Sequence, residues 1–103
     1  MKFTIKKGSP DPLGANKKEN GINFALFSEH ATSVTLSLFS PGGNQPFAEL
    51  ILDSQVNRTG HIWHILVEGL PEHTEYGYRI NESSLLISDP YAKLLNTTRQ
   101  WKA

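Results

Sequence analysis

The 103-residue sequence predicts an all-β fold, an antiparallel sandwich of two sheets in a single domain. Four short segments alternate apolar and polar residues with the period of two that a pleated strand imposes, and a fifth is dense in β-forming residues with apolar groups on both faces. Clusters of turn-forming residues separate these segments, and no segment before the C-terminal tail has the periodicity of a helix. Because parallel strands need crossover connections of a dozen or more residues, the pattern favours antiparallel sheets.

The first part of the chain, residues 1–20, is predicted to be an irregular N-terminal approach to the sandwich. Pro10, Pro12 and Gly14 interrupt residues 8–20. Proline fixes φ and lacks a backbone donor, so this segment is expected to form neither a helix nor a central strand.

The first three predicted strands follow one another with short polar connections. Residues 22–27 carry apolar side chains at every second position, which gives the strand one buried face. Residues 33–38 alternate in the same way and predict a half-buried strand. A turn cluster over residues 40–46 contains two prolines and two glycines, and residues 47–53 resume the alternation beyond it. The second and third strands are therefore expected to form a hairpin.

The fourth and fifth predicted strands differ in how they should be buried. Residues 61–67 carry apolar side chains on both faces, so this strand is expected to be covered on two sides. Residues 76–80 place two tyrosines and an isoleucine on one face. The sandwich module is therefore predicted to span residues 21–81. Residues 82–103 are predicted to be a tail or linker, in which Asp89-Pro90 is suited to begin a helical turn.

Composition narrows the classes of partner. Ten basic and ten acidic side chains cancel, which leaves no net field to attract nucleic acid or an anionic membrane. The N-terminus does not resemble a signal peptide, and no run approaches the ~20 apolar residues of a membrane helix. The absence of cysteine suits a reducing compartment. We therefore predict a cytoplasmic protein that binds neither nucleic acid nor membrane.

Several motifs occur in an order that resembles a known family. They are Pro12-Leu13-Gly14-Ala15, residues 21–28 (GINFALFS), residues 58–64 (RTGHIWH), Tyr76-Gly77-Tyr78-Arg79 and residues 89–93 (DPYAK). Together they resemble the N-terminal carbohydrate-binding-type module of isoamylases and glycogen-debranching enzymes of the α-amylase superfamily. The resemblance implies an immunoglobulin-like sandwich, often classed with glycogen-binding modules, that precedes an α-amylase-type barrel hydrolysing α-1,6 branch linkages. A longer loop usually precedes the last motif in this family, whereas only residues 80–88 intervene here.

The residues themselves predict no catalytic, metal or cofactor site. Retaining glycoside hydrolysis needs two carboxyl groups about 5 Å apart. Glu49 and Asp53 share a predicted strand face but lie roughly 13 Å apart at the rise of a strand. His61 and His64 are three residues apart on a predicted strand, so they point to opposite faces and do not share a metal ion. We therefore predict a non-catalytic chain.

Aromatic side chains are the remaining candidates for a binding site, because aromatic faces stack on sugars while amide and charged groups bond the hydroxyls. In a competing interpretation, Tyr76 and Tyr78 fill the sandwich and Trp63 packs in the core or against another domain. Packing is favoured, since a lone aromatic residue on a strand is usually packed. The aromatic side chains considered are Phe27, Trp63, Tyr76, Tyr78 and Trp101. The candidates for a glucan contact or a domain interface are Trp63, His64, Tyr78 and Arg79.

The favoured function is an accessory module of a glycogen- or starch-debranching system. Such a module would dock on a catalytic barrel and contact α-glucan, as the resemblance implies. Its docking surface would be the outer face of the two-sided strand over residues 62–67, with Trp63 or His64 as an anchor. Two alternatives stay open: an autonomous glycogen-binding module, and a truncated fragment with no independent activity.

Overall fold

The computed structural model describes residues 3–81 and 86–87, which form nine strands. The described residues contain no helix that could cross a membrane. The strands are β1 (Thr4–Lys6), β2 (Gly14–Lys17), β3 (Gly21–Phe27), β4 (Val34–Phe39), β5 (Ala48–Ile51), β6 (Arg58–Thr59), β7 (Ile62–Glu68), β8 (Glu75–Ile80) and β9 (Leu86–Ile87).

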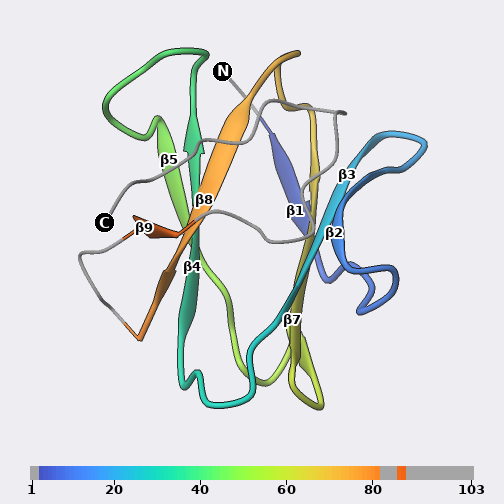
Figure 1. Cartoon of the computed structure of the whole chain (residues 1–103). Helices are drawn as coiled ribbons and strands as arrows, with labels where there is room; N and C mark the ends of the chain where they lie inside the picture. The colour runs from blue at the N-terminus through green and yellow to red at the C-terminus, as the bar shows by residue number, and fades with distance from the viewer. Residues whose placement is uncertain (1–2, 82–85, 88–103) are drawn as a thin grey trace.

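Two antiparallel sheets divide these strands between them (Figure 1). Sheet A has the order β1-β7-β3-β2, with β6 also paired to β7, and sheet B has the order β5-β4-β8-β9. The β3–β7 ladder pairs Gly21 with Glu68 at one end and Phe27 with Ile62 at the other. This arrangement confirms the predicted all-β antiparallel sandwich.

The N-terminal segment contributes more to the sandwich than the sequence predicted. β1 pairs with β7 and β2 pairs with β3, so two strands of sheet A come from residues 1–20, which were expected to be irregular. β2 begins directly after Pro12-Leu13 and lies at the edge of sheet A. An edge strand needs ladder hydrogen bonds on one side only, so a nearby proline is tolerated there.

The third predicted strand is shorter than expected, because β5 ends at Ile51 and a turn begins at Asp53. The Asn57 amide donates to the Asp53 carbonyl at 2.6 Å, and the Gln55 amide donates to the Asp53 carboxylate at 2.8 Å. These bonds turn the chain away from sheet B and toward β6 in sheet A. The alternation of apolar residues alone did not reveal this turn.

Sheet B extends past residue 81, the predicted end of the module. β9 lies within the segment predicted to be a tail, and it pairs with β8 through Tyr78 and Ile87. The helical turn predicted at Asp89-Pro90 lies outside the described residues.

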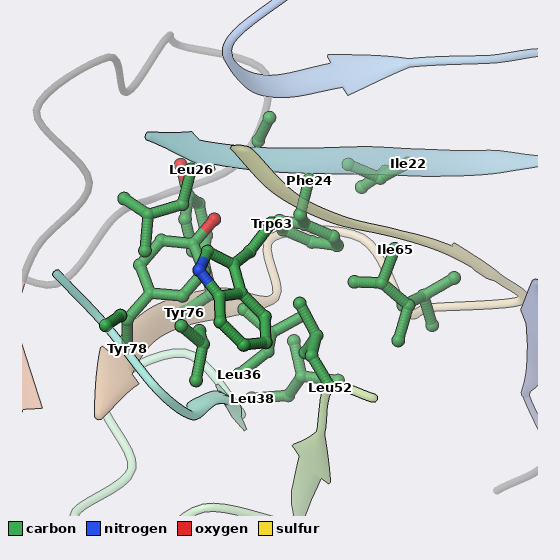
Figure 2. Close-up of a cluster of buried hydrophobic side chains, with 14 residues drawn as sticks. Ile22, Phe24, Leu26, Leu36, Leu38, Leu52, Trp63, Ile65, Tyr76 and Tyr78 are labelled. Carbon is green, nitrogen blue, oxygen red and sulfur yellow. The ribbon is translucent and has the colours of Figure 1, made fainter. Parts of the chain in front are cut away.

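The core between the sheets is filled by aromatic and aliphatic side chains from alternate strand positions (Figure 2). Phe24, Trp63, Tyr76 and Tyr78 are at most 2% exposed. The rings of Phe24 and Tyr76 meet edge to face at 5.0 Å between centroids, and those of Tyr76 and Tyr78 at 5.9 Å. Aromatic pairs prefer this geometry. The packing interpretation of the tyrosines is confirmed, and Trp63 lies in the core with them.

A strap formed by residues 7–9 crosses the outer face of β3 and β7. The Ser9 amide donates to Asn23 Oδ1 at 2.8 Å, and Asn23 Nδ2 donates back to the Ser9 carbonyl at 2.9 Å. One strand away, His64 Nδ1 lies 2.8 Å from the Lys7 carbonyl oxygen. The two-sided burial predicted for residues 61–67 is therefore observed at His64, but the chain's own N-terminal segment provides the cover on the outer face.

Candidate functional site

Trp63 and Tyr78, two of the four residues proposed from the sequence, lie in the sandwich core. Each side chain is 1% exposed, and both belong to the buried cluster of Figure 2. The Arg58 guanidinium lies 5.1 Å from the centre of the Trp63 ring, a cation–π distance. A sugar or a second domain therefore finds neither aromatic face accessible in this structure.

His64 is also buried, but on the opposite face of β7 from Trp63. Its Nδ1 contacts the Lys7 carbonyl and its Nε2 lies 2.9 Å from the Thr59 hydroxyl. A carbonyl oxygen only accepts, so we assign the proton to Nδ1, and Nε2 then accepts from Thr59. His64 thus joins the strap to the β6–β7 hairpin.

Arg79 alone among the four keeps a partly exposed side chain, at 31%. Its Nε lies 2.9 Å from Glu49 Oε2, and the same oxygen accepts from the Ser37 hydroxyl at 3.0 Å. The register pairs Arg79 with Thr35 across β8 and β4, which places this cluster on the outer face of sheet B. Since Trp63 and His64 belong to sheet A, the four proposed residues do not form one site.

The structure instead exposes a pair of rings that we call the aromatic end, formed by Phe27 and His61. Phe27 is 50% exposed, and its ring lies 6.0 Å from that of His61 at an angle of 70°. The Ser28 amide donates to the His61 carbonyl at 2.8 Å, which joins the end of β3 to the β6–β7 turn. The sequence held a signal for this site: Phe27 is the large apolar residue of its strand that falls out of phase with Ile22, Phe24 and Leu26.

A cleft of about 440 Å³ lies at the other end of the β3–β7 ladder. One rim is the β2–β3 turn, closed by a 2.7 Å bond from the Lys18 amide to the Gly21 carbonyl. The other rim is the β7–β8 loop, in which the Thr74 hydroxyl donates to the Pro71 carbonyl at 2.6 Å. No pattern in the sequence indicates this cleft, because its rims are separated by about 50 residues. Its lining consists of residues 17–22, Val67 and residues 69–73.

Acidic and imidazole groups of the described residues are too dispersed for metal chemistry. No three His, Cys, Asp or Glu side chains of this part of the chain could hold a metal ion together. Glu49 is bound to Arg79, whereas Asp53 closes the turn that follows β5. His61 packs on Phe27 and His64 lies under the strap, so the two histidines occupy separate environments.

The two antiparallel sheets around a filled core, with rings exposed at one end and a cleft with charged rims at the other, define a β-sandwich module. Residues 12–92 match the family model described as carbohydrate-binding module 48, the isoamylase N-terminal domain. The chain belongs to this family. It therefore corresponds to the non-catalytic N-terminal module of isoamylase-type glycoside hydrolases, and the sequence matched is not that of the catalytic barrel.

Sequence relatives agree with this assignment, and a solved structure shares the fold. The chain is 44% identical over 114 aligned positions to isoamylase 3, chloroplastic, of Oryza sativa subsp. japonica, covering 93% of the chain and 15% of that protein. It is 38% identical over 105 positions to the glycogen debranching enzyme of Yersinia enterocolitica, covering 90% and 15%. The apo pullulanase of Paenibacillus barengoltzii shares the fold, with a TM-score of 0.68 at 24% identity, over 84% of this chain and 13% of that one. The chain thus spans about 15% of the length of the relatives that it matches.

Proposed function

We propose that this module docks on the catalytic α-amylase-type barrel of a glycogen- or starch-debranching enzyme and contacts α-glucan. In this proposal the barrel hydrolyses α-1,6 branch linkages, and the module contributes no reacting group. The isoamylase and glycogen debranching relatives support the proposal, because the module accounts for about 15% of their length.

The observation that carries the docking proposal is the half-exposed ring of Phe27. Trp63, Tyr76 and Tyr78 are all buried, whereas the ring of Phe27 at the aromatic end is half exposed to solvent. Large aromatic side chains are enriched among the residues that dominate interface energies. We therefore place the docking surface at the aromatic end instead of the outer face of β7, where the strap covers His64.

The docking proposal is tested with Phe27→Ala in the full-length enzyme that contains this chain. Losing a buried interface ring should cost about 2 kcal/mol or more of interdomain stabilisation, seen as a lower midpoint for unfolding of the module in calorimetry. Ile51→Ala is the matched control, since Ile51 is 77% exposed on β5 of the other sheet and lies outside the proposed surface. Equal effects of the two substitutions would contradict docking at the aromatic end.

An autonomous glycogen-binding module is the second candidate. The family description supports it, since the family is one of carbohydrate-binding modules. Affinity electrophoresis of the 103-residue chain in gels that contain glycogen, taken together with the Phe27→Ala comparison, separates the two candidates. Retardation of the chain with no effect of Phe27→Ala on the whole enzyme would favour autonomous binding. A destabilising effect of Phe27→Ala in the whole enzyme would favour a docked module, whether or not the chain by itself is retarded.

We also propose that the protein works in the cytoplasm. The absence of cysteine supports a reducing compartment. Some plant relatives are named as chloroplastic proteins, so an organelle is the alternative to the cytoplasm. Cell fractionation followed by immunodetection tests this proposal, and recovery of the protein in an organelle fraction would contradict it.

A further inference from the structure

The cleft at the Gly21–Glu68 end of the β3–β7 ladder is a preformed depression between two ordered turns. The Lys18–Gly21 and Thr74–Pro71 hydrogen bonds hold its two rims. His73 has a φ of +64°, a left-handed conformation that few non-glycine residues adopt. The volume of about 440 Å³ falls within the range of about 300–1,000 Å³ that small-molecule sites occupy.

The charges around the cleft select against an ionic ligand. Lys17 and Lys18 contribute two positive charges, and Glu19 and Glu72 contribute two negative charges, so the formal sum is zero with His73 neutral. A phosphate or a carboxylate would face two carboxylates, whereas a cationic ligand would face two ammonium groups. The balance favours a neutral ligand that can both donate and accept hydrogen bonds.

The floor of the cleft supplies the complementary apolar contact. Ile22 and Val67 are buried at its base, and Leu70 packs against the core from the β7–β8 loop. A purely apolar ligand would cover the four charged rim groups without giving them partners, which is unfavourable. A sugar satisfies both requirements, since its C–H groups contact the floor while its hydroxyls bond carboxylates, ammonium groups and imidazole.

We propose that this cleft is the α-glucan contact of the module, and that it binds a short α-1,4-linked glucan segment without an aromatic platform. The assignment rests on the glucan contact of the proposed function and moves that contact from the aromatic residues to Lys18, Glu72 and His73. Trp63 and Tyr78 cannot supply it from inside the core. Docking on a barrel at the aromatic end leaves the cleft free, because the two lie at opposite ends of the β3–β7 ladder.

The test is titration of the 103-residue chain with maltoheptaose, followed by amide NMR shifts. Binding with a dissociation constant of about 1 mM should move the amides of residues 17–22 and 69–73. The double variant E72A/H73G should then weaken binding at least about fivefold, because two hydrogen-bonding rim groups are removed. Glycine suits the left-handed φ of His73, so this variant is expected to fold.

The chain offers a matched control in a second Glu-His pair. Glu29 and His30 are exposed in the β3–β4 loop and contact each other at 3.4 Å, near the aromatic end. The variant E29A/H30G should bind maltoheptaose as the unaltered chain does. Equal losses in both variants would overturn the proposal, as would shifts confined to Phe27 and His61 or no shift up to about 10 mM sugar.

A parallel titration with inorganic phosphate tests whether the cleft binds anions. If phosphate moves the same amides with equal affinity, the cleft is an anion site and the inference of a neutral ligand is wrong. These NMR measurements do not depend on the barrel. If the cleft binds no sugar, the Phe27→Ala experiment still tests docking. Conversely, if sugar binds at the cleft and Phe27→Ala has no effect on the whole enzyme, docking at the aromatic end is refuted. The proposed glucan site at the cleft is then supported.

Discussion

The strap over sheet A makes a sharp prediction about Gly8. This residue has a φ of +76°, and a Cβ built there would lie 2.7 Å from both Asn23 Oδ1 and the carbonyl carbon of Ile65. Both a left-handed conformation and close contact with the backbone of β7 therefore demand glycine. Gly8→Ala should force the strap away from β7 and break the bonds between Ser9 and Asn23.

The magnitude follows from two contributions. An alanine in the left-handed region costs about 1 kcal/mol. If the strap lifts, the buried side chains of Asn23 and His64 lose their hydrogen-bond partners in it. Each unsatisfied buried group costs about 1–3 kcal/mol. Gly8→Ala should therefore lower the free energy of unfolding by about 3–7 kcal/mol, the low end applying if water reaches the exposed groups.

Gly42→Ala separates the two contributions, because Gly42 has nearly the same φ, +73°, and a Cβ at this position would meet nothing within 4 Å. Gly42→Ala should lower the free energy of unfolding only by the cost of an alanine in the left-handed conformation, about 1 kcal/mol. Urea unfolding at 25 °C, followed by circular dichroism, measures both variants against the unaltered chain. A difference between Gly8→Ala and Gly42→Ala of less than about 1 kcal/mol would refute the tight seating of the strap.

Two further predictions concern the core and the end of β8. Trp63→Ala should lower the free energy of unfolding by about 3–5 kcal/mol in the same urea experiment, since the ring is buried, and a loss below about 1 kcal/mol would place the ring outside the core. Asn81 has a φ of +53°, and its Oδ1 accepts bonds from the Thr32 and Ser33 amides at 2.6 and 3.2 Å. Asn81→Gly should be more stable than Asn81→Ala by about 0.5–1 kcal/mol, because glycine accepts the left-handed φ; equal losses would show that this φ carries no cost.

Sequence alternation predicted the central strands well because each depends on its own residues. β3, β4, β7 and β8 all fall within one residue of the predicted bounds. The same alternation correctly placed His61 and His64 in different environments, and it put Tyr76 and Tyr78 on one face of their strand, the face that fills the core. In each case the period of two fixes which face a side chain takes, whatever the rest of the chain does.

What covers each face depends on contacts between distant residues, and there the sequence was insufficient. The strap bonds join residues that are 14 and 57 positions apart. Without them, the apolar residues on both faces of β7 suggested a docking surface anchored by Trp63 or His64. The edge strands β1 and β2 were missed for the same reason, since their short, punctuated sequences become strands only beside β7 and β3.

The β3–β7 ladder fixes how far apart the two proposed surfaces lie. It runs through seven residue pairs from Gly21–Glu68 to Phe27–Ile62, which corresponds to about 20 Å at 3.4 Å per residue. A module docked by the aromatic end would therefore hold glucan in the cleft well away from the barrel surface that it touches. A glucan bound in the cleft raises its own effective concentration at the active site only if it is long enough to reach both sites, because its binding at the second site is then intramolecular. Loss of Glu72 and His73 should thus raise KM for long branched glucan and leave a short branched oligosaccharide unaffected.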